Sequence, residues 1–190
     1  MKRIVFAVVL LAATLPVMGQ VNIGLNGVGA QVGFVMPEDP IDNTIGFGAN
    51  VDLGTLMPNL HLTGSLDYWK KSYDDNWGSG YGAYDMEVSF SVISVAALAK
   101  YYFDMGQQFT PYAGGGLGLL FATSKVEVKS SVPGVSGDES DTETELGVHL
   151  LGGASMPITP ELDGFAELRY TLGDIDYFTI LAGVTYALKR

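Results

Sequence analysis

The sequence predicts an all-β fold, an eight-stranded antiparallel up-and-down transmembrane β-barrel that a cleaved signal peptide precedes. Three observations support this prediction. Apolar and polar residues alternate along most of the chain, which is the period of a strand with two different faces. Short and long connectors follow each other in turn. The 190 residues are 47% apolar and only 16% charged, whereas soluble domains carry about 25% charged residues.

The first segment has the layout of a secretory signal peptide. Lys2 and Arg3 precede an apolar run over residues 4–13, and small residues follow up to Gly19. The run is too short for a membrane anchor, because a spanning helix needs about 20 apolar residues. We therefore expect a signal peptide at 1–19 and one outer-membrane barrel domain at 20–190.

Eight later segments are predicted as strands. The clearest is 44–53, where apolar residues from Ile45 to Leu53 alternate with polar residues and glycine. The same alternation marks 60–69, 146–155, 165–172 and 178–188, and it is weaker at 21–35, 86–103 and 109–124. The apolar phase changes at Val92 and Ile93, which predicts a β-bulge there. No later stretch holds 18 uninterrupted apolar residues, which excludes a helical membrane protein.

The connectors differ according to their position. Residues 54–59, 104–108 and 157–161 are short, and they alternate along the chain with connectors that include the long, polar stretches 71–85 and 125–145. Residues 36–43 and 173–176, of intermediate or short length, complete the set. Outer-membrane barrels have tight periplasmic turns and longer outer loops. The acidic run in 125–145 lacks the spacing of an EF-hand, and we expect a solvated, mobile loop.

Two kinds of barrel share this alternation. A lipocalin-like soluble barrel directs its apolar rows inward around a ligand, whereas a membrane barrel directs them outward at lipid. The polar rows carry too few charges for a soluble surface but suit the lumen of a small barrel, which side chains fill. The residues predicted to face lipid are Ile45, Phe47, Val51, Leu53, Leu60, Leu62, Leu66, Leu146, Val148, Leu150, Leu168, Phe178, Ile180, Val184, Tyr186 and Leu188.

The opposite rows predict a polar network in the lumen. Its expected members are Asp52, Asp67, Glu87, Lys100, Glu167, Arg169, His61 and His149. A buried charge is costly unless it is paired, so we expect Arg169 and Lys100 to pair with carboxylates from neighbouring strands. A watery pore is the alternative, but eight strands leave little room for one.

Aromatic residues near the strand ends are predicted to form girdles at the two membrane interfaces. They are Tyr68, Tyr101, Tyr102, Phe103, Tyr112, Tyr170, Tyr177, Phe178 and Tyr186.

Several short motifs resemble those of a known family. These are Lys100-Tyr101-Tyr102-Phe103, the run from Thr110 to Gly116, and Glu167-Leu168-Arg169-Tyr170. Together with the signal peptide and eight alternating strands, they resemble the small outer-membrane β-barrels that include the OmpA transmembrane domain and OmpX. This resemblance implies residence in the outer membrane of a Gram-negative-type bacterium, among outer-membrane lipid and lipopolysaccharide. It also implies that the closing Val184-x-Tyr186-x-Leu188 row is read by the barrel assembly machinery, although Lys189 and Arg190 follow where the family ends on Phe.

Catalytic chemistry is not predicted. The chain has no cysteine, and His149 has no serine at the spacing of a lipid A deacylase, since Ser155 lies six residues away; His61 and His149 are both expected as hydrogen-bonded lumen residues. We expect no enzyme activity, no cofactor and no metal. The formal charge of −11 also argues against a nucleic acid partner.

The sequence favours a structural, envelope-integrity or adhesion role through the outer loops. Exposed aromatics are favoured at binding surfaces, and the candidates for a cell-surface partner are Tyr73, Trp77, Tyr81 and Tyr84. The alternatives are a narrow channel for small solutes, a lipid-modifying enzyme and a soluble periplasmic ligand-binding barrel. The ligand and the oligomeric state do not follow from the sequence.

Overall fold

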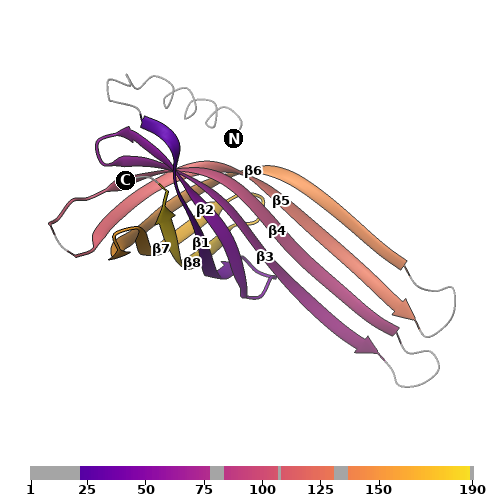
Figure 1. Cartoon of the computed structure of the whole chain (residues 1–190). Coiled ribbons are helices and arrows are strands. Elements are labelled where there is room, and N and C mark those ends of the chain that lie inside the picture. The colour runs from indigo at the N-terminus through magenta and orange to yellow at the C-terminus, as the bar shows by residue number, and fades with distance from the viewer. Residues whose placement is uncertain (1–21, 78–83, 107, 131–136, 189–190) are drawn as a thin grey trace.

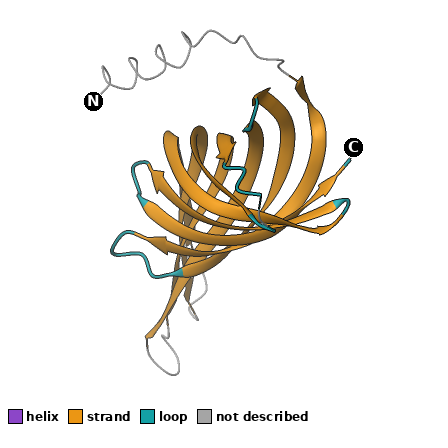
Figure 2. Ribbon diagram, turned by 90° about the vertical axis from the view of Figure 1, so that its left-hand side faces the viewer, coloured by secondary structure: helices purple, strands orange, loops and turns teal. Residues whose placement is uncertain are grey.

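The computed structural model describes residues 22–77, 84–106, 108–130 and 137–188. Its eight strands close into a barrel in which each strand pairs antiparallel with the next and β1 pairs with β8 (Figure 1, Figure 2). The strands are β1 (Asn22–Pro37), β2 (Thr44–Met57), β3 (Leu60–Trp77), β4 (Tyr84–Tyr102), β5 (Thr110–Ser130), β6 (Gly137–Thr159), β7 (Leu162–Leu172) and β8 (Tyr177–Ala187). The predicted eight-stranded up-and-down barrel is confirmed. The predicted signal peptide lies outside the described residues.

Tight turns close one end of the barrel. The β2–β3 turn is Pro58-Asn59, where Asn59 adopts a φ of 66°, a left-handed conformation that asparagine tolerates better than most residues. Residues 160–161 join β6 to β7 at the same end. No helix in the described part of the chain is long and apolar enough to cross a membrane.

The opposite end is uneven, because β3, β4, β5 and β6 continue far beyond the other four strands (Figure 1). Pairing of β2 with β3 stops at Gly46 opposite Trp69, and pairing of β6 with β7 stops at Val148 opposite Leu172. The prediction of long loops at 71–85 and 125–145 was therefore wrong over most of both segments, which are strand up to Trp77 and Ser130 and again from Tyr84 and Gly137. These segments were predicted as loops because they are polar, but a strand whose outer face meets water can carry Ser, Thr, Lys and Glu at its outward positions.

The predicted β-bulge at Val92 and Ile93 was also wrong. The register of β4 with both of its neighbours is unbroken across these residues. Ile93 points outward and is 42% exposed, whereas Val92 points into the barrel and is buried. The apolar residues change from even-numbered to odd-numbered positions for another reason, which is that the environment of the outer face of β4 changes at this point.

The outer face of the four long strands turns from apolar to polar along one line. On β4, the outward residues are Ile93 and Val95 below this line and Ser91 and Glu87 above it. The line continues through Tyr68 of β3 and Phe121 of β5, which pair with Ile93, and it crosses β6 between Leu146 and Thr144. We call the strand segments beyond this line, residues 70–77, 84–91, 123–130 and 137–144, the extension.

Apolar side chains close the barrel interior just below the extension. Val35, Trp69, Val92, Leu120 and Tyr177 form one buried cluster, and the ring of Trp69 lies 5.7 Å from that of Tyr177 and 5.6 Å from that of Phe90. Ile41, from the loop between β1 and β2, packs against this cluster. The lumen is thus covered by side chains at the end from which the extension rises.

Candidate functional site

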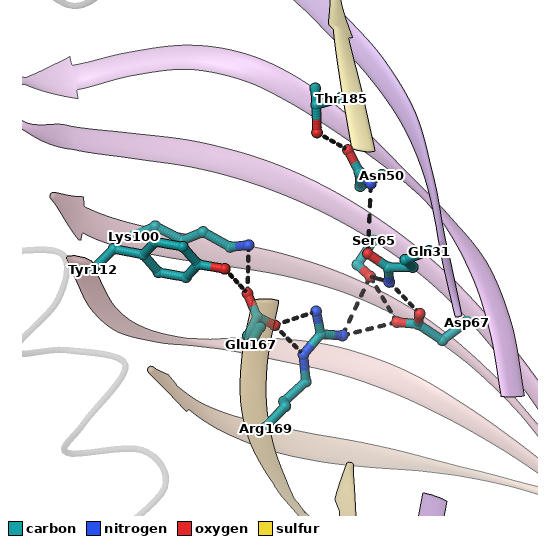
Figure 3. Close-up of polar contacts among 9 residues, drawn as sticks. All are labelled: Gln31, Asn50, Ser65, Asp67, Lys100, Tyr112, Glu167, Arg169 and Thr185. Carbon is teal, nitrogen blue, oxygen red and sulfur yellow. Dashed lines mark hydrogen bonds and ion pairs between the residues drawn. The ribbon is translucent and has the colours of Figure 1, made fainter. Parts of the chain in front are cut away.

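A network of charged side chains crosses the middle of the barrel. Glu167 of β7 is 2% exposed, and one of its oxygens accepts hydrogen bonds from Lys100 Nζ of β4 at 2.6 Å and from the Tyr112 hydroxyl of β5 at 2.9 Å (Figure 3). Its other oxygen accepts from Arg169 Nη2 at 2.6 Å and from Nε at 2.9 Å. Arg169 Nη1 also donates to Asp67 of β3 at 2.8 Å. Two carboxylates and two cations therefore compensate each other where water is scarce.

Neutral polar groups extend this network towards β1 and β8 (Figure 3). Gln31 donates to Ser65 at 3.1 Å and to Asp67, and the Ser65 hydroxyl donates to Asp67 at 2.6 Å. Asn50 and Thr185 continue the chain of hydrogen bonds, with Thr185 donating to Asn50 at 2.8 Å.

The prediction that Arg169 and Lys100 pair with carboxylates of neighbouring strands was wrong with respect to the strands. Lys100 of β4 pairs with Glu167 of β7, and Arg169 of β7 pairs with Asp67 of β3 as well as with Glu167 of its own strand. The lumen is narrow enough for long side chains to meet across it.

The other predicted lumen residues are separated by the structure. Asp52 and His61 line a cavity of about 200 Å³ at the short-turn end of the lumen, together with Lys100 and Tyr112. His149 is 1% exposed, and its Nδ1 lies 3.0 Å from the Thr171 hydroxyl. These three residues face the interior without bonding to Glu167 or Arg169 in the described contacts.

Glu87 does not belong to the lumen. It lies opposite Asp74 in the extension and pairs on the outer face with Lys70, at 3.8 Å, where the two side chains are 35% and 44% exposed. The prediction failed because β4 was given a bulge, which would have changed the face on which Glu87 lies. With a continuous register, odd-numbered residues of β4 stay outward.

The predicted lipid-facing rows lie on the outer wall. Ile45, Phe47 and Leu150 are 64%, 61% and 54% exposed, and Leu66, Leu146, Leu168, Ile180, Val184, Tyr186 and Leu188 are also exposed. Val51, Leu53, Leu60, Leu62, Val148 and Phe178 are half-buried on the wall.

Three tyrosines of the predicted girdles point inward instead. Tyr112 and Tyr177 are buried, and Tyr102 stacks on Tyr112 with a ring separation of 5.1 Å. Tyr112 was missed as a network member because it was assigned by its place near a strand end. Its even number in β5, shared with inward Gly116 and Leu120, was the available signal.

The aromatic candidates for partner binding are only partly described. The Tyr73 hydroxyl accepts the backbone N–H of Asp42 at 2.7 Å, so this ring supports the loop between β1 and β2. Tyr81 and the side chains of Trp77 and Tyr84 lie outside the described residues.

No group of three or more His, Cys, Asp or Glu side chains in the described part of the chain is placed to hold a metal ion. What the site offers is a lumen that a charge-balanced network crosses, and a polar sheet that stands above an apolar wall.

A profile of the family described as outer membrane protein beta-barrel domain matches residues 5–187. The chain belongs to this family. Outer-membrane barrels expose an apolar band to lipid and carry their short turns on the periplasmic side. The outer membrane is therefore the location of this barrel. Because the short turns lie at the opposite end, we expect the extension to rise on the outer side.

Solved structures share the fold at low identity. Neisserial surface protein A (NspA) is 21% identical with a TM-score of 0.55, over 87% of this chain and 99% of that one. The N-terminal β-barrel domain of Pseudomonas aeruginosa OprF is 14% identical with a TM-score of 0.52, over 87% and 99%. Ail, the attachment invasion locus protein of Yersinia pestis, is 16% identical with a TM-score of 0.50, over 87% and 100%. No curated protein sequence matches the chain.

Proposed function

We propose that this outer-membrane barrel is a non-enzymatic surface protein that acts by adhesion or partner binding through the extension. The observation that carries the proposal is the extension itself, four paired strands that continue past the end of the apolar wall. Strands that only had to cross the bilayer would need about 9–11 residues, whereas β5 runs from Thr110 to Ser130. The additional length builds an ordered surface in the external medium.

The obstructed lumen supports an interaction role over transport. Trp69, Leu120 and Tyr177 cover the interior at the outer end, and the Glu167 network crosses its middle. The contacts of His149 support the non-enzymatic part of the proposal, because its Nδ1 is engaged by a threonine rather than by an acid. One of the similar structures, Ail, is named for attachment and invasion; we transfer adhesion to this chain only as part of the proposal.

We also propose two partners on the basis of the outer wall. Lys70 and Lys125 lie on the outer face of the extension near the apolar boundary, where the phosphates of lipopolysaccharide would be. The exposed row of Val184, Tyr186 and Leu188 on β8 is the surface we propose for the barrel assembly machinery.

Removing the extension tests the proposal. Residues 71–90 and 125–140 can each be replaced by Asn-Gly, because Lys70 pairs with Ser91 and Ser124 pairs with Asp141, so a two-residue hairpin can close each gap. Cells that display the shortened barrel should adhere less to host cells and matrix proteins than cells that display the full chain. Equal adhesion by both, at equal surface amounts of heat-modifiable barrel, would refute the proposal.

A further inference from the structure

The inner face of the extension carries an apolar strip that no other strand in the described part of the chain covers. Val88 and Phe90 of β4 and Val126 of β5 lie on this face, since Val88 lies opposite Val126. Ala122 of β5, opposite Val92, continues the strip just below the boundary. Val88 is 37% exposed. The opposite wall cannot shield the strip, because β1, β2, β7 and β8 end below it (Figure 1). The strip continues directly into the buried cluster around Trp69, against which Phe90 and Ala122 pack.

An acidic wall stands beside this strip. Asp141, Glu143 and Glu145 of β6 line a cleft of about 290 Å³ together with Asp174 from the turn between β7 and β8. Phe90, Ala122 and Ile175 supply the apolar side of the same cleft, and Ser124 completes it. The cleft is therefore apolar on its floor and negatively charged along one side.

The described lysines do not neutralise this wall. Lys71 lies on the same cross-strand row as Phe90, Ser124 and Asp141, three strands from Asp141 and thus about 14 Å from it between backbones. Its ammonium group is directed to the loop between β1 and β2, where it lies 3.4 Å from Asp42. Lys70 and Lys125 face outward and pair with Glu87 and Glu127. Asp141 and Glu143 have no ion-pair partner among the described residues.

We propose that this cleft docks a cationic segment of a partner protein, one in which an apolar side chain is flanked by lysine or arginine. The inference rests on the proposed adhesive function and names the chemistry of the partner. The apolar side chain would lie on Phe90 and Ala122, and the flanking cations would pair with Asp141 and Glu143. A polyanion would be repelled by the same carboxylates, and a small cation would leave the apolar floor exposed to water.

Peptide binding to the full chain in phosphatidylcholine nanodiscs tests this directly. The probe is a fluorescein-labelled Lys-Arg-Trp-Arg-Lys peptide, compared with the same peptide carrying Gly for Trp and with Glu-Asp-Trp-Asp-Glu. We expect the first peptide to bind most tightly. Asp141→Asn with Glu143→Gln should weaken it about fivefold to tenfold, as the loss of two exposed ion pairs implies. Ala122→Ser, which makes the floor of the cleft more polar, should reduce the advantage of Trp over Gly.

The matched control is Glu87→Gln with Glu127→Gln, which removes two negative charges from the outer face of β4 and β5 in the same extension. If this variant weakens binding as much as the inner pair does, the peptide senses only overall charge and the cleft is not the site. Equal binding of the Trp and Gly peptides would also overturn the proposal. These results are separable from the adhesion test: a cleft without selectivity on an extension that still mediates adhesion would refute this inference alone.

Discussion

At the scale of residues, Arg169 holds the lumen network together, because it is the group that contacts both Glu167 and Asp67. Arg169→Ala would leave Lys100 as the one cation of the described network to compensate the two carboxylates. Loss of one partner from a buried ion pair costs about 3–5 kcal/mol, so the urea midpoint of unfolding in detergent should fall strongly. Lys70→Ala, which removes the exposed partner of Glu87, is the control and should cost about 1 kcal/mol or less. Similar losses in the two variants would show that the lumen pair is solvated.

Glu145 predicts a pH dependence outside the membrane. It lies just beyond Leu146 at the outer rim and accepts the backbone N–H of Asp174. Partial burial, together with the nearby negative charges of Asp174 and Glu143, raises the pKa of its carboxyl above the ordinary value. A raised pKa means that the folded state holds this proton more tightly than the unfolded state. Stability should therefore increase as the pH falls through the raised pKa towards the ordinary value.

Glu145→Gln isolates this effect. The free energy of unfolding of the parent should rise relative to that of the variant as the medium is acidified, because only the parent gains a proton at this position. Chemical unfolding of both proteins between neutral pH and the ordinary range of a glutamate measures it. A difference that does not change with pH would contradict the assignment.

At the scale of elements, β5 is packed so closely against β4 that it depends on glycine. A Cβ on Gly116 would overlap the carbonyl oxygen of Ala97, whereas a Cβ on Gly152 of β6 would meet its nearest described atom, the carbonyl oxygen of Tyr112, at 3.8 Å. Gly116→Ala should therefore destabilise the barrel by about 1–3 kcal/mol, and Gly152→Ala should be tolerated. Heat-modifiability on a gel, followed by urea unfolding, compares the two. Equal stability of the two variants would mean that β4 and β5 can move apart enough to accommodate the added methyl group.

The sequence predicts the two faces of a strand correctly where the apolar residues point outward along its whole length. Strand β2 is such a strand, with Phe47 outward and Asn50 inward, so its face assignments needed no structure. Strand β4 is not, since Ile93 faces outward below the boundary and Phe90 inward above it. If the outer face of β4 is assumed to meet a single environment, the alternation requires a bulge. This assumption assigned Glu87 to the wrong face. The contacts of Lys100 with Glu167 and of Arg169 with Asp67 were beyond the sequence, because which strands oppose each other across a lumen depends on how the barrel closes.

At the scale of the whole molecule, the polarity line on β3 to β6 predicts where hydrocarbon ends. The chain lacks cysteine, so single Cys substitutions report on one site each. Leu66 is 49% exposed below the line, and the Lys70 side chain is 44% exposed above it. In nanodiscs, a membrane-impermeant maleimide should label Lys70→Cys readily and Leu66→Cys slowly, although both side chains are accessible on the isolated barrel. Comparable labelling of the two would place the boundary elsewhere.

This inversion of polarity also sets the depth of the protein. A slide of two residues along the barrel axis keeps every side chain on its own face, so alternation alone would permit it. The inverted pattern opposes the slide in either direction: moving inward would bring Ser91 into hydrocarbon, and moving outward would bring Ile93 into water. The barrel is therefore held at one depth in the bilayer. A partner that docks on the extension binds at a constant distance from the membrane surface.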